Sequence, residues 1–161
     1  MPKILVVYYS AQAHTERIAK QIADKLKADT FVLEPKEPYV ESDFDWTNPM
    51  SRVSCEHNDE SLRDVELVKT LPDNWAEYDT VIIGYPIWWG IAAWPVNTFI
   101  KTADFADKTV IPFCTSHSSA EGGSAKALQD VAKDGNWQEG FRFSQDATDA
   151  EVAEWVDGLS I

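Results

Sequence analysis

Two adjacent tryptophans follow a short apolar run near the middle of the chain. The run covers residues 80–84, and Trp88 and Trp89 lie in the loop 86–92 that comes after it. The length of the run and its β-branched residues are typical of a strand buried on both faces. Large rings just past the end of such a strand suit stacking on a flat heteroaromatic ligand. Packing in the core or against a partner is the alternative role for these rings.

A second candidate loop, residues 10–15, joins an apolar run to a helical pattern. Backbone N–H groups at a helix N-terminus, together with the helix dipole, make such a turn a phosphate site. The loop also offers hydroxyl, amide and imidazole groups, from Ser10, Gln12, His14 and Thr15. The alternative is that Gln12 or a neighbour only caps the helix.

The third candidate loop, residues 115–124, is small and polar. It allows backbone groups to approach the polar edge of a ring, and it opens with Thr115, Ser116 and His117. His117 is a candidate proton donor, although a lone histidine in a polar loop is more often simply solvated.

These loops are positioned by strands that alternate with helices. Strands are expected at residues 4–9, 30–33, 80–84, 109–114 and 137–143, and helices at 15–27, 95–101, 124–133 and from 148 onward. The alternation predicts an α/β fold, a doubly wound five-stranded parallel sheet in the order 2-1-3-4-5 with helices on both faces. Ligands of such sheets bind at the carboxyl ends of the strands, where the strand order reverses. All three loops should meet there.

Three local signals refine this scheme. Thr148 with Glu151 three residues later forms a capping box, and Pro95 suits the first turn of a helix. Pro112 conflicts with its place in a central strand, because proline removes a ladder hydrogen bond. We therefore expect a bulge at Pro112.

Residues 34–77 form a long insert between the second and third strands of what we expect to be a single domain, residues 1–161. A short helix is expected at 61–69. Tyr39, Phe44 and Trp46 give the insert enough aromatic surface to pack. Long ordered loops are often functional, so the insert either covers part of the ligand site or is only a surface cover.

Composition narrows the possible partners and compartment. Fourteen basic against 27 acidic side chains give the chain a net charge of −13, which disfavours nucleic acid and anionic membranes and is compatible with basic partner proteins. Two cysteines, Cys55 and Cys114, are too few for a disulfide framework and lack metal-ligand spacing. Neither a signal peptide nor a membrane-spanning apolar stretch is evident, so we expect a cytoplasmic protein without a metal site.

Taken together, these residues resemble the flavodoxin family, in particular a bacterial flavodoxin-like branch that binds FMN. The resemblance spans nearly the whole chain. It is carried by Tyr8-Tyr9-Ser10 with Thr15, by residues 84–90 and 108–116, and by Asp45-Trp46, Ser51-Arg52 and Glu56.

The resemblance implies a flavodoxin-like fold and a site for FMN. The phosphate would lie at Ser10, Gln12, Ala13, His14 and Thr15, the ring at Pro86, Ile87, Trp88, Trp89 and Gly90, and the second wall at Thr115, Ser116 and His117. The family usually has glycine and asparagine where this chain has Ala13 and His14, and a hydroxyl residue in place of Gln12. Because alanine does not readily adopt a positive φ angle, the phosphate loop is expected to bind less tightly.

Three functions remain open on these residues. The first is an electron carrier that passes electrons between partner proteins, with the protein orienting and tuning FMN. The second is an FMN-dependent reductase that uses NAD(P)H to reduce quinones or similar small molecules. The third is a flavin-free binding module on the same fold. The acidic charge and the lack of a nicotinamide-binding glycine motif favour the carrier.

Overall fold

A parallel sheet forms the centre of the computed structural model, which describes residues 3–11, 13–89, 91–116, 123–132 and 134–159. Its strands lie in the order β2-β1-β3-β5-β6, with β4 paired to β3 and β7 paired to β5. Their bounds are β1 Ile4–Tyr8, β2 Asp29–Val32, β3 Thr80–Trp88, β4 Ile91–Ala92, β5 Thr109–Ser116, β6 Asn136–Trp137 and β7 Phe141–Ser144. Because β4 is a short arm returning from β3, this is the expected order 2-1-3-4-5, with β6 and β7 as the fifth strand.

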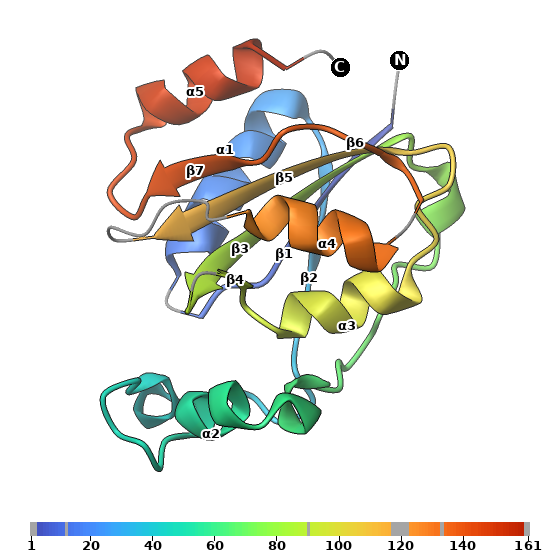
Figure 1. Cartoon of the computed structure of the whole chain (residues 1–161). Helices are drawn as coiled ribbons and strands as arrows, with labels where there is room; N and C mark the ends of the chain where they lie inside the picture. The colour runs from blue at the N-terminus through green and yellow to red at the C-terminus, as the bar shows by residue number, and fades with distance from the viewer. Residues whose placement is uncertain (1–2, 12, 90, 117–122, 133, 160–161) are drawn as a thin grey trace.

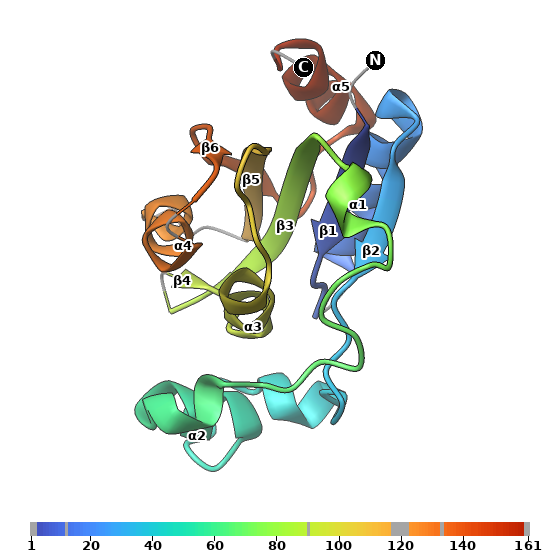
Figure 2. The same ribbon diagram turned by 90° about the vertical axis from the view of Figure 1, so that its right-hand side faces the viewer.

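Helices cover both faces of the sheet (Figures 1 and 2). The helices are α1 His14–Leu26, α2 Arg52–Asn58, α3 Pro95–Thr102, α4 Ser124–Ala132 and α5 Asp149–Asp157. Helices α1 and α5 pack on one face, and α3 and α4 pack on the other. The expected α/β flavodoxin-like architecture is confirmed.

The strand β3 occupies the middle of both cores. Val81 and Ile83 pack with α3 and α4, whereas Ile82 packs with α1 and α5. All three side chains are fully buried. This alternation follows from the period of two in a strand, and burial on both faces explains why the run is continuously apolar.

Two of the local helix signals are confirmed. The hydroxyl of Thr148 accepts a hydrogen bond from the N–H of Glu151 at 3.2 Å, and the Glu151 carboxylate accepts one from the N–H of Thr148 at 3.4 Å. Pro95 is the first residue of α3, where its missing N–H costs no helical bond.

Pro112 lies inside β5 without the bulge that we expected. The pairing of β5 with β3 keeps an unbroken register through Ile83↔Pro112 and Gly84↔Phe113. On its other side, β5 pairs with β6 near its start and with β7 near its end, so that Pro112 falls between the two paired stretches. Since proline has no N–H to donate, the fifth strand is interrupted where a donor is missing. The bulge prediction was wrong, and the predicted strand 137–143 is two short strands.

The connection from β2 to β3, residues 34–77, contains α2 and the 3-10 turns η1 Glu41–Phe44, η2 Glu60–Arg63 and η3 Trp75–Glu77. The expected helix at 61–69 was wrong. Instead, the backbone of residues 66–68 is extended, because the N–H of Lys36 bonds the carbonyl of Glu66 at 2.8 Å and the N–H of Val68 bonds that of Glu34 at 2.7 Å. In Figures 1 and 2 the part of this connection around α2 lies below α3, at one end of the sheet.

No helix in the described ranges combines the length and the apolar character needed to span a membrane.

Gly84 provides a test of how tightly β3 and β5 are packed. A Cβ at this position would lie 2.2 Å from Cζ of Phe113, whose ring is fully buried. We expect Gly84→Ala to lower the free energy of unfolding by about 1–3 kcal/mol through overpacking, as measured by urea denaturation. In a double-mutant cycle with Phe113→Leu, the two losses should be strongly non-additive. Additive losses would contradict the proposed clash.

Candidate functional site

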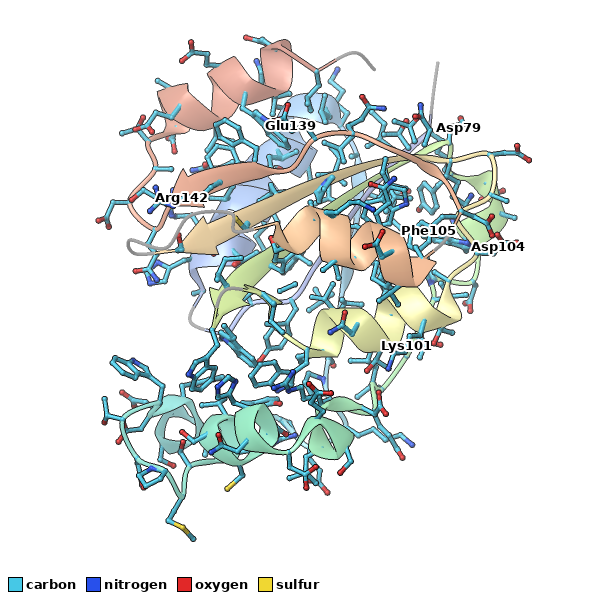
Figure 3. The ribbon with its side chains drawn as sticks, viewed as in Figure 1. Asp79, Lys101, Asp104, Phe105, Glu139 and Arg142 are labelled. Atoms are coloured by element: carbon cyan, nitrogen blue, oxygen red, sulfur yellow. The ribbon has the colours of Figure 1, made fainter. Side chains whose placement is uncertain are left out.

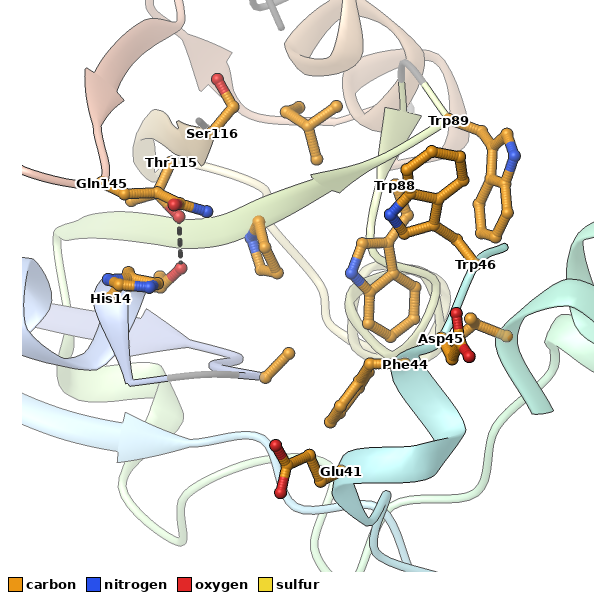
Figure 4. Close-up of a pocket in the computed structure, with 15 residues that line it drawn as sticks. His14, Glu41, Phe44, Asp45, Trp46, Trp88, Trp89, Thr115, Ser116 and Gln145 are labelled. Carbon is orange, nitrogen blue, oxygen red and sulfur yellow. Dashed lines mark hydrogen bonds between the residues drawn. The ribbon is translucent and has the colours of Figure 1, made fainter. Parts of the chain in front are cut away.

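A cavity of about 840 Å³ opens at the carboxyl ends of β1, β3 and β5 (Figure 4). This volume lies in the range of cofactor and small-molecule sites. Its walls come from all three candidate loops, from residues 41–53 and from the end of β7. The lining residues are Ala11, His14, Thr15, Glu41, Phe44, Asp45, Trp46, Val53, Pro86, Ile87, Trp88, Trp89, Thr115, Ser116 and Gln145.

One side of the cavity is polar. The hydroxyls of Thr15 and Thr115 are 2.7 Å apart and both residues are buried, so this hydrogen bond ties the first helix to the end of β5 (Figure 4). The guanidinium of Arg142 donates to the hydroxyl of Ser116 at 2.7 Å and to its carbonyl at 3.1 Å. Arg142 lies in β7, next to the end of β5 (Figure 3).

The first loop presents a helix N-terminus to this polar side. The hydroxyl of Ser10 accepts the N–H of Glu16 at 3.2 Å. No side chain caps α1 through its N-cap residue, Ala13, and the described residues offer no acceptor for the N–H groups of His14 and Thr15. Two such amides at the positive end of a helix dipole are suited to an anion such as phosphate.

Ala13 adopts the backbone conformation that usually requires glycine. Its φ is 68° and its ψ is −5°, in the left-handed region. An L-residue in this region costs roughly 1–2 kcal/mol, because its Cβ crowds the following carbonyl. The first loop therefore has a positive φ at Ala13, and this conformation carries the energetic cost of that strain.

The opposite side of the cavity is aromatic. The ring of Trp88 meets Tyr9, Tyr39, Phe44 and Trp94 at centroid distances of 5.7, 5.5, 6.0 and 4.8 Å. Most of these contacts are tilted or edge-on, arrangements that aromatic rings prefer. In Figure 4, Trp46, Trp88 and Trp89 lie together, across the cavity from His14 and Gln145.

The two tryptophans of the pair differ in their surroundings. Trp88 ends β3 and is half-buried, whereas Trp89 has a φ of 48° and is 40% exposed. Trp89 stacks on the ring of His57 at 4.2 Å and nearly parallel, at 6°. This stacking connects the turn after β3 to α2.

The strand that carries the tryptophan pair is longer than expected. It continues beyond residue 84 to Trp88 and returns as β4, with Trp88 opposite Ile91. The loop prediction for 86–92 was therefore wrong in part, because this stretch is a hairpin whose turn contains Trp89. Antiparallel pairing gives the extra strand residues a hydrogen-bonded partner that the central ladder no longer supplies.

Eight of the predicted site residues line the cavity: His14, Thr15, Pro86, Ile87, Trp88, Trp89, Thr115 and Ser116. Ser10 and Ala13 do not line it, and they shape the loop behind it instead. Gln12, Gly90 and His117 lie outside the described residues. That these residues bind a cofactor stays a prediction.

Seven lining residues were not predicted: Ala11, Glu41, Phe44, Asp45, Trp46, Val53 and Gln145. Gln145 follows β7, and the rule that ligands bind at the carboxyl ends of parallel strands was sufficient to find it. Residues 41–53 come from the long connection, which was considered as a possible cover but without assigned contacts. Glu41 and Asp45 add two carboxylates, and no lysine or arginine is among the described lining residues.

The described residues contain no group of three or more histidine, cysteine, aspartate or glutamate side chains placed to hold a metal ion.

Comparison with known proteins assigns the family. The flavodoxin family model matches residues 3–159. The chain belongs to the flavodoxin family. A search of curated protein sequences finds no match.

Solved structures resemble this flavodoxin over nearly its whole length. A candidate flavoprotein from Bacteroides eggerthii DSM 20697 is 38% identical at a TM-score of 0.88, covering 100% of this chain and 99% of its own. One from Bacteroides uniformis ATCC 8492 is 39% identical at a TM-score of 0.88, covering 97% and 98%. A flavoprotein from Lactobacillus acidophilus NCFM, solved in complex with FMN, is 22% identical at a TM-score of 0.69, covering 96% and 99%, and shares the fold.

The strain at Ala13 can be measured directly. We expect Ala13→Gly to raise the free energy of unfolding by about 0.5–1 kcal/mol, because the relief of the left-handed strain exceeds the added entropy of glycine in the unfolded chain. Urea denaturation is the measurement. Ala11→Gly is the matched control, since Ala11 does not have a positive φ and should lose stability on substitution. A loss of stability in Ala13→Gly would contradict this account.

Two buried tyrosines of the aromatic side predict alkaline sensitivity. Burial raises the pKa of Tyr9 above its usual value near 10, and burial followed by the hydrogen bond to Glu56 raises the pKa of Tyr39. Above pH 10 the unfolded chain releases these protons while the folded protein keeps them, so the free energy of unfolding falls as pH rises. Each tyrosine contributes about 1.4 kcal/mol per pH unit.

Tyr39→Phe should reduce this alkaline slope by about 1.4 kcal/mol per pH unit while leaving the stability profile below pH 9 parallel to that of the wild type. Urea denaturation across the alkaline range gives both slopes. An unchanged slope would show that the proton of Tyr39 is not held by the fold.

Proposed function

We propose that this flavodoxin-family protein binds FMN in the cavity and carries electrons between partner proteins. The proposal rests on one observation: the two sides of the cavity present different chemical groups. Amides and hydroxyls at the N-terminus of α1 lie on one side, and tryptophans lie on the other. A ligand with an anionic phosphate and a planar ring matches both, and the FMN complex of the Lactobacillus acidophilus flavoprotein supports this cofactor.

The residues present fit FMN. The N–H groups of His14 and Thr15 and the hydroxyl of Thr15 would hold the phosphate, and Trp88 would contact the ring. FMN, when bound, supplies the redox chemistry, and the protein supplies binding, orientation and electrostatics.

The carboxylates of Glu41 and Asp45 add an electrostatic effect. Negative charges near the cavity disfavour the gain of further negative charge inside it. A single charge about 10 Å away is worth roughly 0.4–1.7 kcal/mol, for an effective dielectric constant between about 80 and 20. Both carboxylates would therefore lower the potential of a bound cofactor.

The carrier is favoured over an NAD(P)H-dependent reductase by the charge of the cavity wall. An NAD(P)H-dependent reductase must accommodate the anionic pyrophosphate of the dinucleotide beside the bound FMN, and negative charge at the cavity disfavours this second anion. Here, the described lining residues offer two carboxylates and neither lysine nor arginine. This wall disfavours the dinucleotide and is compatible with electrons arriving from another protein.

We further propose that the partner presents a basic surface and that both proteins meet in the cytoplasm. Residues 34–77 contain 12 acidic and four basic side chains, a net charge of −8 out of −13 for the chain. Trp46, at the cavity, is 70% exposed and Met50 is 80% exposed. Apolar side chains surrounded by like charge are suited to a complementary, electrostatically guided contact. The chain has only two cysteines, Cys55 and Cys114, too few for the disulfide framework of many exported proteins.

Titration of the purified apoprotein into FMN tests the cofactor. We expect quenching of the flavin fluorescence at one FMN per chain. Trp88→Phe should raise the Kd about threefold to tenfold, since a stacked aromatic contact is worth about 0.5–1.5 kcal/mol. Trp155→Phe is the matched control, because Trp155 lies in α5, packs against Phe143 of β7 and does not line the cavity, so the Kd of this variant should not change. Absence of quenching in the wild type would favour a flavin-free binding module.

Steady-state assays then separate the carrier from the reductase. The FMN-loaded protein should not turn over a quinone with NAD(P)H alone, but it should pass electrons between a basic reductase and an acceptor protein, more slowly at high salt. Fast quinone turnover with NAD(P)H and no partner would establish the reductase.

A further inference from the structure

We infer that Glu56 is a positioning residue that holds Trp88 in the wall of the cavity. Glu56 lies in α2, within the 34–77 connection, and its side chain is only 8% exposed. It does not line the cavity itself. The inference rests on the proposed function where it concerns FMN affinity, and on geometry alone where it concerns Trp88.

Three donors from separate parts of the chain converge on this one carboxylate. The Tyr39 hydroxyl and the Trp94 indole N–H, at 2.9 Å, both donate to Oε1, and Nε of Arg52 donates to Oε2 at 3.2 Å. Tyr39 follows β2, Arg52 begins α2, and Trp94 immediately precedes α3. A buried carboxylate that satisfies three donors fixes their orientations, because any rotation leaves a buried polar group unpaired.

Two of these donors are also the neighbours of Trp88. The rings of Tyr39 and Trp94 lie 5.5 and 4.8 Å from Trp88, between ring centroids. The guanidinium of Arg52 lies 3.7 Å from the centre of the Tyr39 ring, which fixes that ring from its face. Two of the four rings that surround Trp88 therefore share one acceptor.

Glutamine cannot replace Glu56 in this arrangement. A carboxylate accepts at both oxygens, whereas an amide accepts at one and donates at the other. In Glu56→Gln the amide nitrogen must face either Arg52 or the pair formed by Tyr39 and Trp94, and each of these is a donor. The substitution keeps the volume of the side chain and leaves at least one of the three donors facing another donor instead of its acceptor.

The test is a double-mutant cycle on FMN binding. We expect Glu56→Gln to raise the Kd for FMN about threefold to tenfold, as expected for a misplaced stacking ring. In the Trp88→Phe background the same substitution should change the Kd less than about twofold, because its effect passes through Trp88. Equal factors in both backgrounds, or no effect in either, would overturn the inference. The control Glu66→Gln alters an exposed carboxylate of the same connection and should leave the Kd unchanged.

A second readout is independent of FMN. The near-ultraviolet circular dichroism that Trp88→Phe removes from the wild type should already be absent from Glu56→Gln. If that signal persists, Glu56 does not position Trp88. If the wild type binds no FMN, the proposed function fails, and this spectrum alone decides the role of Glu56.

Should Glu56→Gln not fold, Tyr39→Phe replaces it in both experiments. This variant removes one donor to Glu56 and keeps the ring beside Trp88. The same loss of additivity with Trp88→Phe is expected, and additive effects would count against the inference.

Discussion

The hydrogen-bonded ladders on both sides of β3 determine where the rest of the molecule lies. The strand pairs in parallel with β1 on one side and β5 on the other, in continuous register. Parallel pairing brings the carboxyl ends of all three strands to one edge, and burial on both faces prevents β3 from slipping by a residue. This register also brings the start of α1 beside the end of β5, so that Thr15 and Thr115 can share a hydrogen bond.

The two sides of the cavity differ in chemistry because different parts of the structure form them. The strand ends and the first turn of α1 supply amides and hydroxyls whose positions follow from the sheet. The aromatic side is formed by the turn after β3 and by the connection 34–77. In the described ranges these segments are not paired with the parallel sheet, so other contacts must position their rings. The rings are held by contact with one another and by the buried carboxylate of Glu56. The polar side thus follows from the fold of the sheet, and the aromatic side depends on how residues 34–77 pack against the end of β3.

This division also explains how much could be predicted from the sequence. The strand order, the four helices that cover the sheet and the capping box of Thr148 depend on local patterns and on general rules of parallel sheets, and they were predicted, whereas α2 was not. The split of the fifth strand was not, because Pro112 affects a neighbouring strand rather than its own. The contacts of Phe44 and Trp46 with the cavity were also missed, since no local pattern shows which side of a long connection faces the sheet. Gln145 was missed although the rule for strand ends covers it.

Two of the four non-glycine residues with a positive φ in the described ranges, Ala13 and Trp89, belong to the first loop and to the tryptophan turn, on opposite sides of the cavity. Ala13 and Trp89 both have positive φ angles, of 68° and 48°, in conformations that glycine would adopt at lower cost. At Trp89, the stacked ring of His57 offsets part of this cost. Ala13 is the N-cap of α1, so its strain lies directly before the amides of His14 and Thr15. Strain of this kind concentrates where a binding site needs a fixed geometry. Lys27 and Asp107 have the same strain outside the cavity lining, so a positive φ by itself does not assign a residue to the site, and the case for one ligand rests on the contents of the two walls.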